Sequence, residues 1–374
     1  MKERIIFHLP YKIDPNRPSA SQIRPLKMIK GFIELGYDVD VIMGNSKERK
    51  ILIDTIKKNI RDGIAYKFLY SESSTMPTLL TDPHHFPLRP CLDFSFFTFC
   101  RRNGIPIGLF YRDIHWVFSF NGKSTSLKTR ISNIFYKYDV YKYNRLLDVL
   151  FLPSLEMSRY IPNLKIENLC ELPPGLEMFE KVKSNDIFKS NNINILYVGG
   201  LSRDIYNIEL LVREINKHPD ITLTICCRVY DFEQLEESFK NDLLNTQNIK
   251  IVHKQGIDLI ELYENSDLCC LFLKPIDYWN FAMPAKTFEY LSFLKPILAV
   301  KGTVVGSFVE KKNIGWSIDY SSDELNRFLN NIKTDTTNFS NIQRNAFIER
   351  EKHTWKMRAA TVSENMLLKT NNYL

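Results

Sequence analysis

The chain has 374 residues, of which 44% are hydrophobic and 25% are charged. This is too long for one ordinary domain and too apolar for a disordered chain, so we expect two domains with separate cores. The 50 basic and 43 acidic residues give a formal net charge of +7. Such a mild excess suits anionic ligands or an anionic membrane surface. It lacks the dense basic blocks of a nucleic-acid-binding protein, so we expect no nucleic-acid partner.

The cysteines and the apolar runs indicate the cellular compartment in which the protein works. The seven cysteines form no CxxC pair, and the doublets Cys226-Cys227 and Cys269-Cys270 lie in apolar runs. They are typical of core thiols in a reducing compartment. No run approaches the ~18 apolar residues of a membrane span, and Met1 opens onto a charged stretch and a strand. We therefore expect a cytoplasmic protein.

The first part of the chain predicts alternating strands and helices. Its apolar runs and 3.6-residue patterns give strand 4–10, a helix with apolar positions Ile23, Leu26, Ile29, Phe32 and Ile33, strand 38–44, strand 64–69, helix 92–102, strand 105–110, helix 127–147 and strand 149–152. Continuous apolar runs are typical of buried parallel strands. We predict an α/β domain over residues 1–175, and a linker at 175–190 that begins with Pro173-Pro174-Gly175.

The alternation then restarts. It predicts strands at 193–200, 221–227, 249–256, 267–273, 296–300 and 314–318, with helices at 208–216, 233–244, 259–265, 284–294, 308–311 and 323–332 between and after them. Residues 341–368 are helical in pattern. The predicted fold class is α/β, with two doubly wound Rossmann-like domains, the second over 190–345. We expect the C-terminal helix, 350–374, to cross back to the N-terminal domain.

The stretch "NFAMPAKTFEYLSFLKPILAV" (280–300) predicts a helix that starts near Pro284. One predicted face packs, and the other, free to bind, carries Lys286, Glu289, Tyr290 and Phe293. A lysine in the first turn opposes the helix dipole, which suggests a phosphate partner. Glu289 suits a ribose diol as a bidentate acceptor. A plain surface ion pair between Lys286 and Glu289 is equally compatible with the spacing.

"MPAKTFEYLSFLKPILAV" resembles the donor-site signature of GT-B glycosyltransferases of the bacterial cell-envelope type. The resemblance extends to "LYVGGLSRDIYNIELL" (196–211), "SASQIRPLKMIKGFIELGYDVDVIMG" and "HTWKMRAA", and so to most of the chain except residues 70–100. It implies a nucleotide-sugar donor whose ribose is held by Glu289. It places these further residues at the donor: Gly199, Gly200, Arg203, Gln255, Gly256, Pro284, Lys286 and Thr287.

Simpler explanations remain for these positions. Residues 199–203 can be a tight turn with a solvated arginine, and residues 255–256 a loop without a ligand. One departure from the family pattern stands at Phe281, where many retaining members have a glutamate eight positions before the one at Glu289. Sugar preference and stereochemical outcome are therefore open.

"IGLFYRDIHWVF" (107–118) ends a buried strand with Arg112, Asp113 and His115 at its carboxyl edge. Glycosyl transfer needs a base for the acceptor hydroxyl and cations near the leaving diphosphate. We predict Asp113 as the base if the transfer inverts, and His115 as a group that orients acceptor or donor, with Arg112 near phosphate or paired to Asp113. Alternatively, Asp113 caps the following turn and His115 is a surface imidazole.

Ser19, Ser21 and Arg24 follow the first strand and are predicted to contact the acceptor or a phosphate. Ser21 could equally serve as a helix cap.

Two apparent metal motifs lack suitable partners. Asp38-Val39-Asp40 begins an apolar strand, and His84-His85 lies in a proline-rich loop without ligands at the right spacing. We expect neither a cofactor nor an obligatory metal.

Residues 115–145 mix aromatic with basic residues, a composition suited to anionic lipid headgroups. The set is Trp116, Phe118, Phe120, Tyr136, Tyr138, Tyr141, Tyr143, Lys128, Arg130, Lys137, Lys142 and Arg145. A packed core with a solvated face explains it nearly as well.

These features predict a metal-independent glycosyltransferase that uses a UDP- or GDP-linked sugar. By resemblance, its acceptor is a saccharide or lipid-linked saccharide in bacterial surface polysaccharide synthesis, at the cytoplasmic face of the membrane. Two alternatives remain: a sugar-nucleotide 2-epimerase of the same fold, and a non-catalytic nucleotide-sugar-binding subunit of an assembly complex.

Overall fold

The computed structural model describes residues 2–14, 19–118, 127–179, 192–334 and 336–370. The chain divides into two compact units. Unit 1 comprises Met1–Gly175 with Trp355–Leu374, and unit 2 comprises Leu176–Thr354. Residues 180–190 of the predicted linker lie outside the described residues. The return of Trp355–Leu374 to unit 1 agrees with the predicted crossing of the C-terminal helix.

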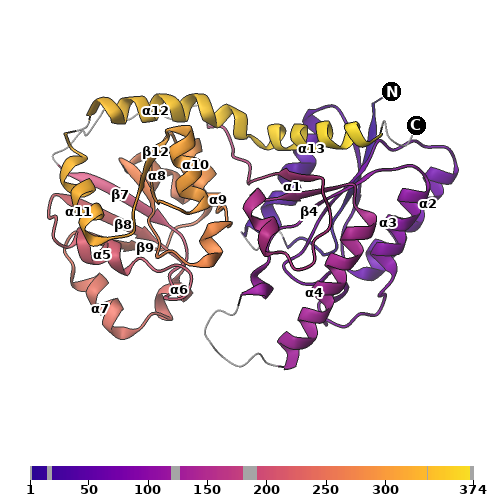
Figure 1. Cartoon of the computed structure of the whole chain (residues 1–374), viewed down its shortest axis with the longest axis horizontal. Coiled ribbons are helices and arrows are strands. Elements are labelled where there is room, and N and C mark those ends of the chain that lie inside the picture. The colour runs from indigo at the N-terminus through magenta and orange to yellow at the C-terminus, as the bar shows by residue number, and fades with distance from the viewer. Residues whose placement is uncertain (1, 15–18, 119–126, 180–191, 335, 371–374) are drawn as a thin grey trace. The chain divides into compact units, whose positions relative to one another are not determined.

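Unit 1 is built on a parallel sheet with the order β2-β1-β3-β4-β5-β6 (Figure 1). Its strands are β1 Arg4–His8, β2 Asp38–Ile42, β3 Leu69–Glu72, β4 Ile107–Phe110, β5 Val149–Leu152 and β6 Leu169–Glu171. Its main helices are α1 Ala20–Glu34, α2 Ser46–Arg61, α3 Leu92–Arg102, α4 Leu127–Leu146 and α13 Trp355–Thr370. The order reverses between β1 and β3, so the carboxyl ends of these two strands flank the switch point where such sheets bind ligands.

Unit 2 has a parallel sheet with the order β12-β11-β10-β7-β8-β9, and its switch point lies between β7 and β10. Its strands are β7 Ile193–Val198, β8 Ile221–Cys226, β9 Ile249–Val252, β10 Leu268–Leu271, β11 Ile297–Val300 and β12 Gly315–Ile318. Its helices are α5 Glu209–Ile215, α6 Val229–Glu233, α7 Glu237–Asn245, α8 Leu259–Glu264, α9 Ala285–Ser292, α10 Val304–Lys312, α11 Ser322–Asn331 and α12 Thr336–Arg350.

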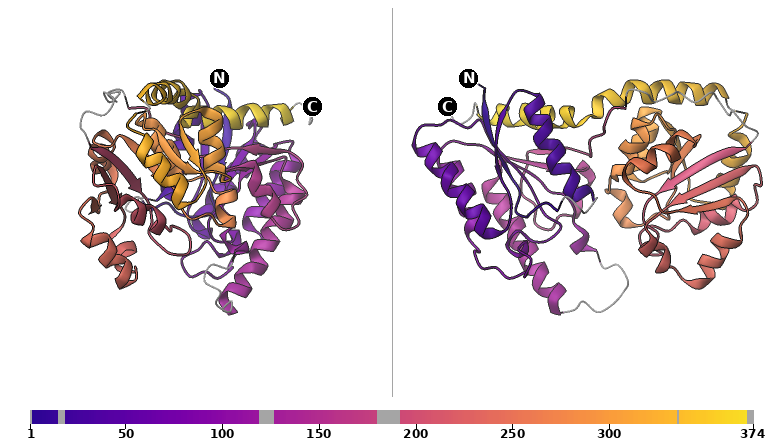
Figure 2. Two further views of the ribbon diagram at one scale, coloured as in Figure 1. Left: turned by 60° about the vertical axis from the view of Figure 1, so that its left-hand side comes forward. Right: turned by 180° about the vertical axis from the view of Figure 1, so that it is seen from behind.

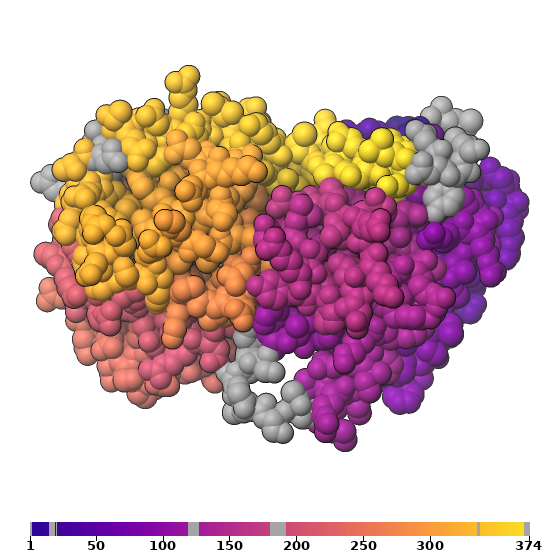
Figure 3. Space-filling model, viewed as in Figure 1, coloured from indigo at the N-terminus to yellow at the C-terminus, as the bar shows by residue number. Residues whose placement is uncertain are grey.

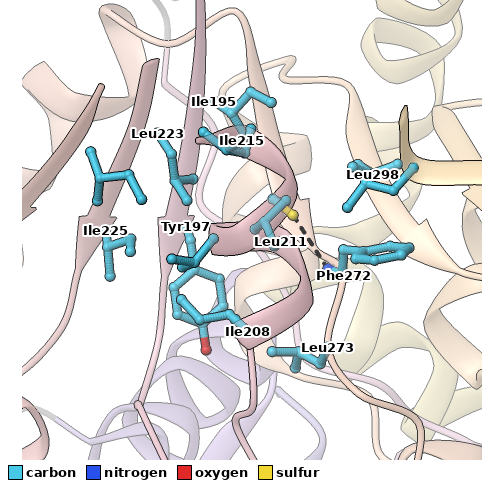
Figure 4. Close-up of a cluster of buried hydrophobic side chains, with 14 of the residues drawn as sticks. Ile195, Tyr197, Ile208, Leu211, Ile215, Leu223, Ile225, Phe272, Leu273 and Leu298 are labelled. Carbon is cyan, nitrogen blue, oxygen red and sulfur yellow. Dashed lines mark hydrogen bonds between the residues drawn. The ribbon is translucent and has the colours of Figure 1, made fainter. Parts of the chain in front are cut away.

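Both faces of the unit 2 sheet are buried, as β7 shows. Ile193, Ile195 and Tyr197 join a core with α5, α7 and α11, whereas Leu196 and Val198 join a core with α8, α9 and α10. Figure 4 shows Ile195 and Tyr197 beside Leu211 and Ile215 of α5. Figure 2 shows helices on both faces of this sheet. This two-sided burial explains the continuous apolar runs, and the predicted doubly wound α/β class is confirmed.

Several predicted elements are wrong in detail. Helix α2 and strand β6 were not predicted, β3 begins where the strand predicted at 64–69 ends, and the helix predicted at 233–244 is the pair α6 and α7. The apolar face of α1 is also different: Ile23, Leu26 and Ile33 are exposed, while Met28 and Phe32 are buried.

Candidate functional site

Helix α9 and the end of β7 are joined at the switch point of unit 2. The hydroxyl of Tyr290 accepts a hydrogen bond from the amide of Val198 at 2.9 Å, and both residues are buried. Val198 is followed directly by Gly199 and Gly200. The two segments that the sequence singles out for donor binding therefore lie together. Tyr290 and Phe293 are buried, so the prediction that they share a free face with Lys286 and Glu289 is wrong.

Lys286 and Glu289 remain partly exposed and form an ion pair with each other. The surface pair that the spacing allows is thus present. Glu289 also accepts a hydrogen bond from the hydroxyl of Tyr263, with 2.9 Å between Oε2 and the phenol oxygen. Burial raises the pKa of Tyr263 far above its usual range, so this phenol stays a donor. The contact holds one oxygen of Glu289 in place.

The first turn of α9 has no side-chain cap. Pro284 is the N-cap residue, one position earlier than predicted, and makes no side-chain cap. The amide of Thr287 bonds to the carbonyl of Pro284 at 3.1 Å. The Thr287 side chain is fully buried, and its hydroxyl has no partner among the described residues. The hydroxyl of Thr287 is thus shielded from solvent and its amide is already bonded, so the contact of Thr287 with the donor stays a prediction.

Steric crowding alone explains why the two residues after β7 are glycines. A Cβ at Gly199 would lie 2.7 Å from the Tyr197 hydroxyl, and one at Gly200 would lie 3.0 Å from the ring of Tyr206.

Arg203 donates to Glu209 at 2.9 Å and to Glu236 at 2.5 Å. It also lines a groove of about 580 Å³ at α5 and α7, whose lining residues all lie outside α9. Arg203 is thus paired to carboxylates.

The loop after β9 adds a second lysine. Lys254 pairs with Glu261 at 2.6 Å, and its carbonyl accepts a 3.3 Å contact from the thiol of Cys226 at the end of β8. Gln255 is exposed, and Gly256 adopts φ +59°, a conformation that favours glycine. Phe281 is buried against Tyr278, with 5.2 Å between ring centroids, so it offers no polar group to a sugar.

In unit 1, Asp113 is engaged with its own loop. Its Oδ1 accepts from the amides of Ile114 at 2.7 Å and His115 at 3.1 Å, which is the turn cap that the alternative predicted. His115 Nδ1 lies 3.9 Å from Asp113 Oδ2, and its Nε2 lies 3.4 Å from the Tyr136 hydroxyl. Trp116 stacks on the Tyr136 ring at 5.1 Å. An oriented carboxylate and imidazole therefore lie side by side after β4.

Arg112 pairs with Glu72, not with Asp113. Its Nη2 donates to Glu72 at 3.0 Å and to the Tyr11 hydroxyl at 3.2 Å. Arg24 donates to the other Glu72 oxygen at 3.2 Å and lies over the Phe110 ring at 3.6 Å. Glu72 ends β3 at the switch point of unit 1 and is fully buried. It was not predicted, because nothing in its local sequence marks it.

This cluster carries an excess positive charge, since two arginines face one carboxylate. The Nη2 of Arg24 is buried and has no hydrogen-bond partner in the described part of the chain. Ser19 is the N-cap residue of α1 and makes no side-chain cap. Its hydroxyl contacts that of Ser21 at 2.9 Å, so Ser21 is not the cap.

The apparent metal motifs have other partners. Asp38 and Asp40 lie 3.6 and 3.7 Å from Arg4 guanidinium nitrogens. His85 contacts the carbonyl of Leu80 at 3.0 Å, and His84 lies 3.8 Å from Asp82. Across the described ranges, no group of three His, Cys, Asp or Glu side chains is arranged to hold a metal ion. Within the same ranges, no helix is both long and apolar enough to cross a membrane.

Solved structures resemble the whole chain. HepE of Anabaena in complex with UDP superposes with a TM-score of 0.66 at 14% identity, covering 96% of this chain and 98% of its own. A glycosyltransferase from Rickettsia africae gives a TM-score of 0.66 at 14% identity, covering 99% of both chains. WaaG, a glycosyltransferase involved in lipopolysaccharide biosynthesis, gives 0.60 at 13%, covering 96% and 99%.

No protein-family model and no curated protein sequence matches the chain. At these identities the structural likeness establishes architecture. The two Rossmann-like units, their strand orders and the end-to-end coverage show that the chain has the GT-B fold.

Proposed function

We propose that this protein is a glycosyltransferase that moves a sugar from a nucleotide-sugar donor to a saccharide or lipid-linked saccharide acceptor. One observation carries the proposal. Tyr290 of α9 bonds to Val198, the last residue of β7 and the one before Gly199-Gly200, at the switch point of unit 2, and the same helix carries the partly exposed Lys286 and Glu289. Helix starts and switch points of this kind are where open parallel sheets bind nucleotide phosphates.

The ion pair between Lys286 and Glu289 is compatible with this role. A surface pair three residues apart on a helix contributes only a few tenths of a kcal/mol. A diphosphate can therefore replace Glu289 as the partner of Lys286 at little cost. Glu289 keeps its bond from Tyr263 and presents its carboxylate to the ribose hydroxyls.

Of the two donors that the sequence leads us to expect, UDP- and GDP-linked sugars, the named neighbours support the UDP-linked one. HepE is described in complexes with UDP and with UDP-glucose. WaaG is described as acting in lipopolysaccharide biosynthesis. By this likeness we assign the acceptor to bacterial surface polysaccharide synthesis. The residues that we propose to line the donor are those that the sequence resemblance implies: Gly199, Gly200, Arg203, Gln255 and Gly256.

We assign the acceptor to unit 1. If the transfer inverts, Asp113 takes the proton of the acceptor hydroxyl as that oxygen bonds to the anomeric carbon, while the bond to the diphosphate breaks and the nucleoside diphosphate leaves. His115 orients the reacting groups. The two arginines of the Glu72 cluster, Arg24 and Arg112, hold an anionic group of the acceptor, because the single carboxylate of Glu72 balances only one of their two positive charges. The hydroxyls of Ser19 and Ser21 lie nearby. We expect turnover without a divalent metal, which an assay in EDTA checks.

Product analysis tests the proposal. The full chain is incubated with UDP- and GDP-sugars, with and without lipid-linked saccharides, and products are identified by mass spectrometry and chromatography. Transfer predicts a product heavier by one sugar that forms only with acceptor. Conversion of the donor alone to an isomer would show an epimerase. Donor binding without any product across the panel would favour a binding subunit.

A further inference from the structure

Helix α4 packs into unit 1 mainly through one of its two apolar faces, although Tyr138 on the other side contacts the Phe94 ring, with 5.8 Å between the centroids. Tyr136, Val140 and Tyr143 are buried on the inner face, together with Asp139. The opposite face exposes large apolar side chains. These are Leu127, Ile131, Ile134 and Tyr141, with exposed fractions of 73%, 46%, 65% and 49%.

The exposed side chains form one stripe. At about 100° per residue, Leu127, Ile131, Ile134 and Tyr141 fall within about 40° of a single line along the helix, opposite the buried set. The first turns of α4 extend beyond the rest of unit 1 in the ribbon views (Figures 1 and 2). In the space-filling view, this magenta end stands out from the surface of unit 1 (Figure 3). The stripe is thus accessible along its outer side.

Basic residues border the stripe on both sides. By the same angular count, Lys128 and Lys142 lie on one side of it, and Arg130 and Lys137 on the other. Arg145 lies at its end, over the Tyr141 ring at 5.0 Å. The sole acidic residue in the α4 sequence is the buried Asp139. Within the described residues, none of these five basic side chains forms an ion pair with a carboxylate, and Lys142 and Arg145 lie over the rings of Tyr138 and Tyr141.

We propose that this face of α4 docks unit 1 onto an anionic lipid bilayer. An apolar stripe flanked by lysine and arginine is the arrangement of a helix that lies in the membrane interface. The apolar side chains enter the boundary of the acyl chains, and the basic heads reach the phosphates on either side. A second copy of the chain would set five cations against five cations, so charge complementarity favours the lipid surface.

The proposal is independent of glycosyl transfer, because binding to lipid is measured without donor or acceptor. The full chain is floated with vesicles of neutral phosphatidylcholine, and with vesicles that also contain phosphatidylglycerol. We expect about tenfold or stronger partition onto the anionic vesicles, weakening as salt is raised.

Matched variants locate the contact. Ile134→Glu should lower the partition about tenfold, because a charge would enter the apolar layer. Ile51→Glu, at a 62% exposed position of α2, should leave it unchanged. Lys137→Glu should weaken binding about tenfold, whereas Lys58→Glu on α2 should not. These positions are exposed, so all four variants should keep the wild-type melting temperature.

Equal partition onto neutral and anionic vesicles would overturn the proposal. So would wild-type binding by Ile134→Glu. If the wild type ignores vesicles and self-associates in sedimentation, while Ile134→Glu is monomeric, the face is an interface between copies and lipid docking is wrong.

Discussion

Glu72 is the residue on which the charged cluster of unit 1 depends. It is fully buried and accepts from Arg24, Arg112 and the Tyr70 hydroxyl. A buried carboxylate of this kind compensates the cost of removing two guanidinium groups from water. The cluster therefore fixes β3, α1 and the loop after β4 relative to one another.

Glu72→Gln should destabilise unit 1 by roughly 3–5 kcal/mol, because it leaves the buried Arg24 and the largely buried Arg112 without a counter-charge. Chemical denaturation monitored by circular dichroism measures the loss. Glu34→Gln removes only a surface pair with Lys30 and should cost less than about 1 kcal/mol. If Glu72→Gln were as stable as the wild type, the Glu72 carboxylate would not offset the cost of removing the two guanidinium groups from water.

Asp139 should give unit 1 an unusual pH dependence. Burial raises its pKa to about 7, from an ordinary value of 3.8, while its Oδ2 accepts from the amide of Thr78 at 2.7 Å. The folded state therefore binds more protons than the unfolded state between these values. The contribution of Asp139 to the free energy of unfolding is therefore fully present at low pH and is lost as the pH rises toward 7.

Asp139→Asn should remove this dependence. Relative to wild type, the variant should gain roughly 1.4 kcal/mol per pH unit between about pH 4 and 7. Buried His8 has a lowered pKa because of burial, so it destabilises the fold toward acid, with the opposite sign. Since His8 is common to both proteins, the difference between their unfolding free energies isolates Asp139. A difference that stays constant with pH would contradict the assignment.

Asp113→Asn tests the proposed base. Asparagine can still accept the two backbone bonds from Ile114 and His115, so the loop should keep its shape. Turnover should fall by about a hundredfold or more, with donor affinity nearly unchanged. Steady-state kinetics and calorimetry measure the two quantities separately. Retained activity would show that Asp113 is only a turn cap.

At the level of elements, the strands were the most predictable from the sequence. Val149–Leu152 was predicted as observed, and β7, β8 and β11 differ from prediction only at their ends. Burial on both faces makes such runs continuously apolar, so they need no long-range information. Helix α2 was missed although it has a local signal. Asn45 and Glu48 form a capping box at its start.

Helix α1 shows where local patterns fail. Its buried side is set partly by α13, which comes more than three hundred residues later in the sequence. Gly31 lies against this helix. A Cβ there would be 2.8 Å from the carbonyl oxygen of Trp355 and 3.0 Å from the Cβ of Ala359.

Gly31→Ala should therefore destabilise unit 1 by about 1–3 kcal/mol, although alanine is the better helix former. Lys30→Ala, at an exposed position of the same helix, should change stability by less than about 1 kcal/mol. Thermal unfolding compares the two. A stabilised Gly31→Ala would mean that α1 and α13 do not pack this closely.

For the whole molecule, the sequence predicted two doubly wound units and the return of the C-terminal helix, and the structure agrees. The site was less predictable. The positions of Lys286, Glu289 and Asp113 followed from motifs, but their partners did not. Tyr263 lies 26 residues before Glu289, and Glu72 lies 40 residues before Arg112. Only the folded chain brings these polar groups together, so local sequence cannot pair them.

The central claim is that unit 2 binds a nucleoside diphosphate sugar through the start of α9. Calorimetric titration of the full chain with UDP, GDP and their glucose conjugates tests it most directly, beside Glu289→Ala, Lys286→Ala and the exposed control Lys311→Ala. We predict saturable binding of one nucleotide series, weakened about tenfold or more by Glu289→Ala and Lys286→Ala and unchanged by the control. Unchanged affinity in both site variants, or binding to none of the nucleotides, would contradict it.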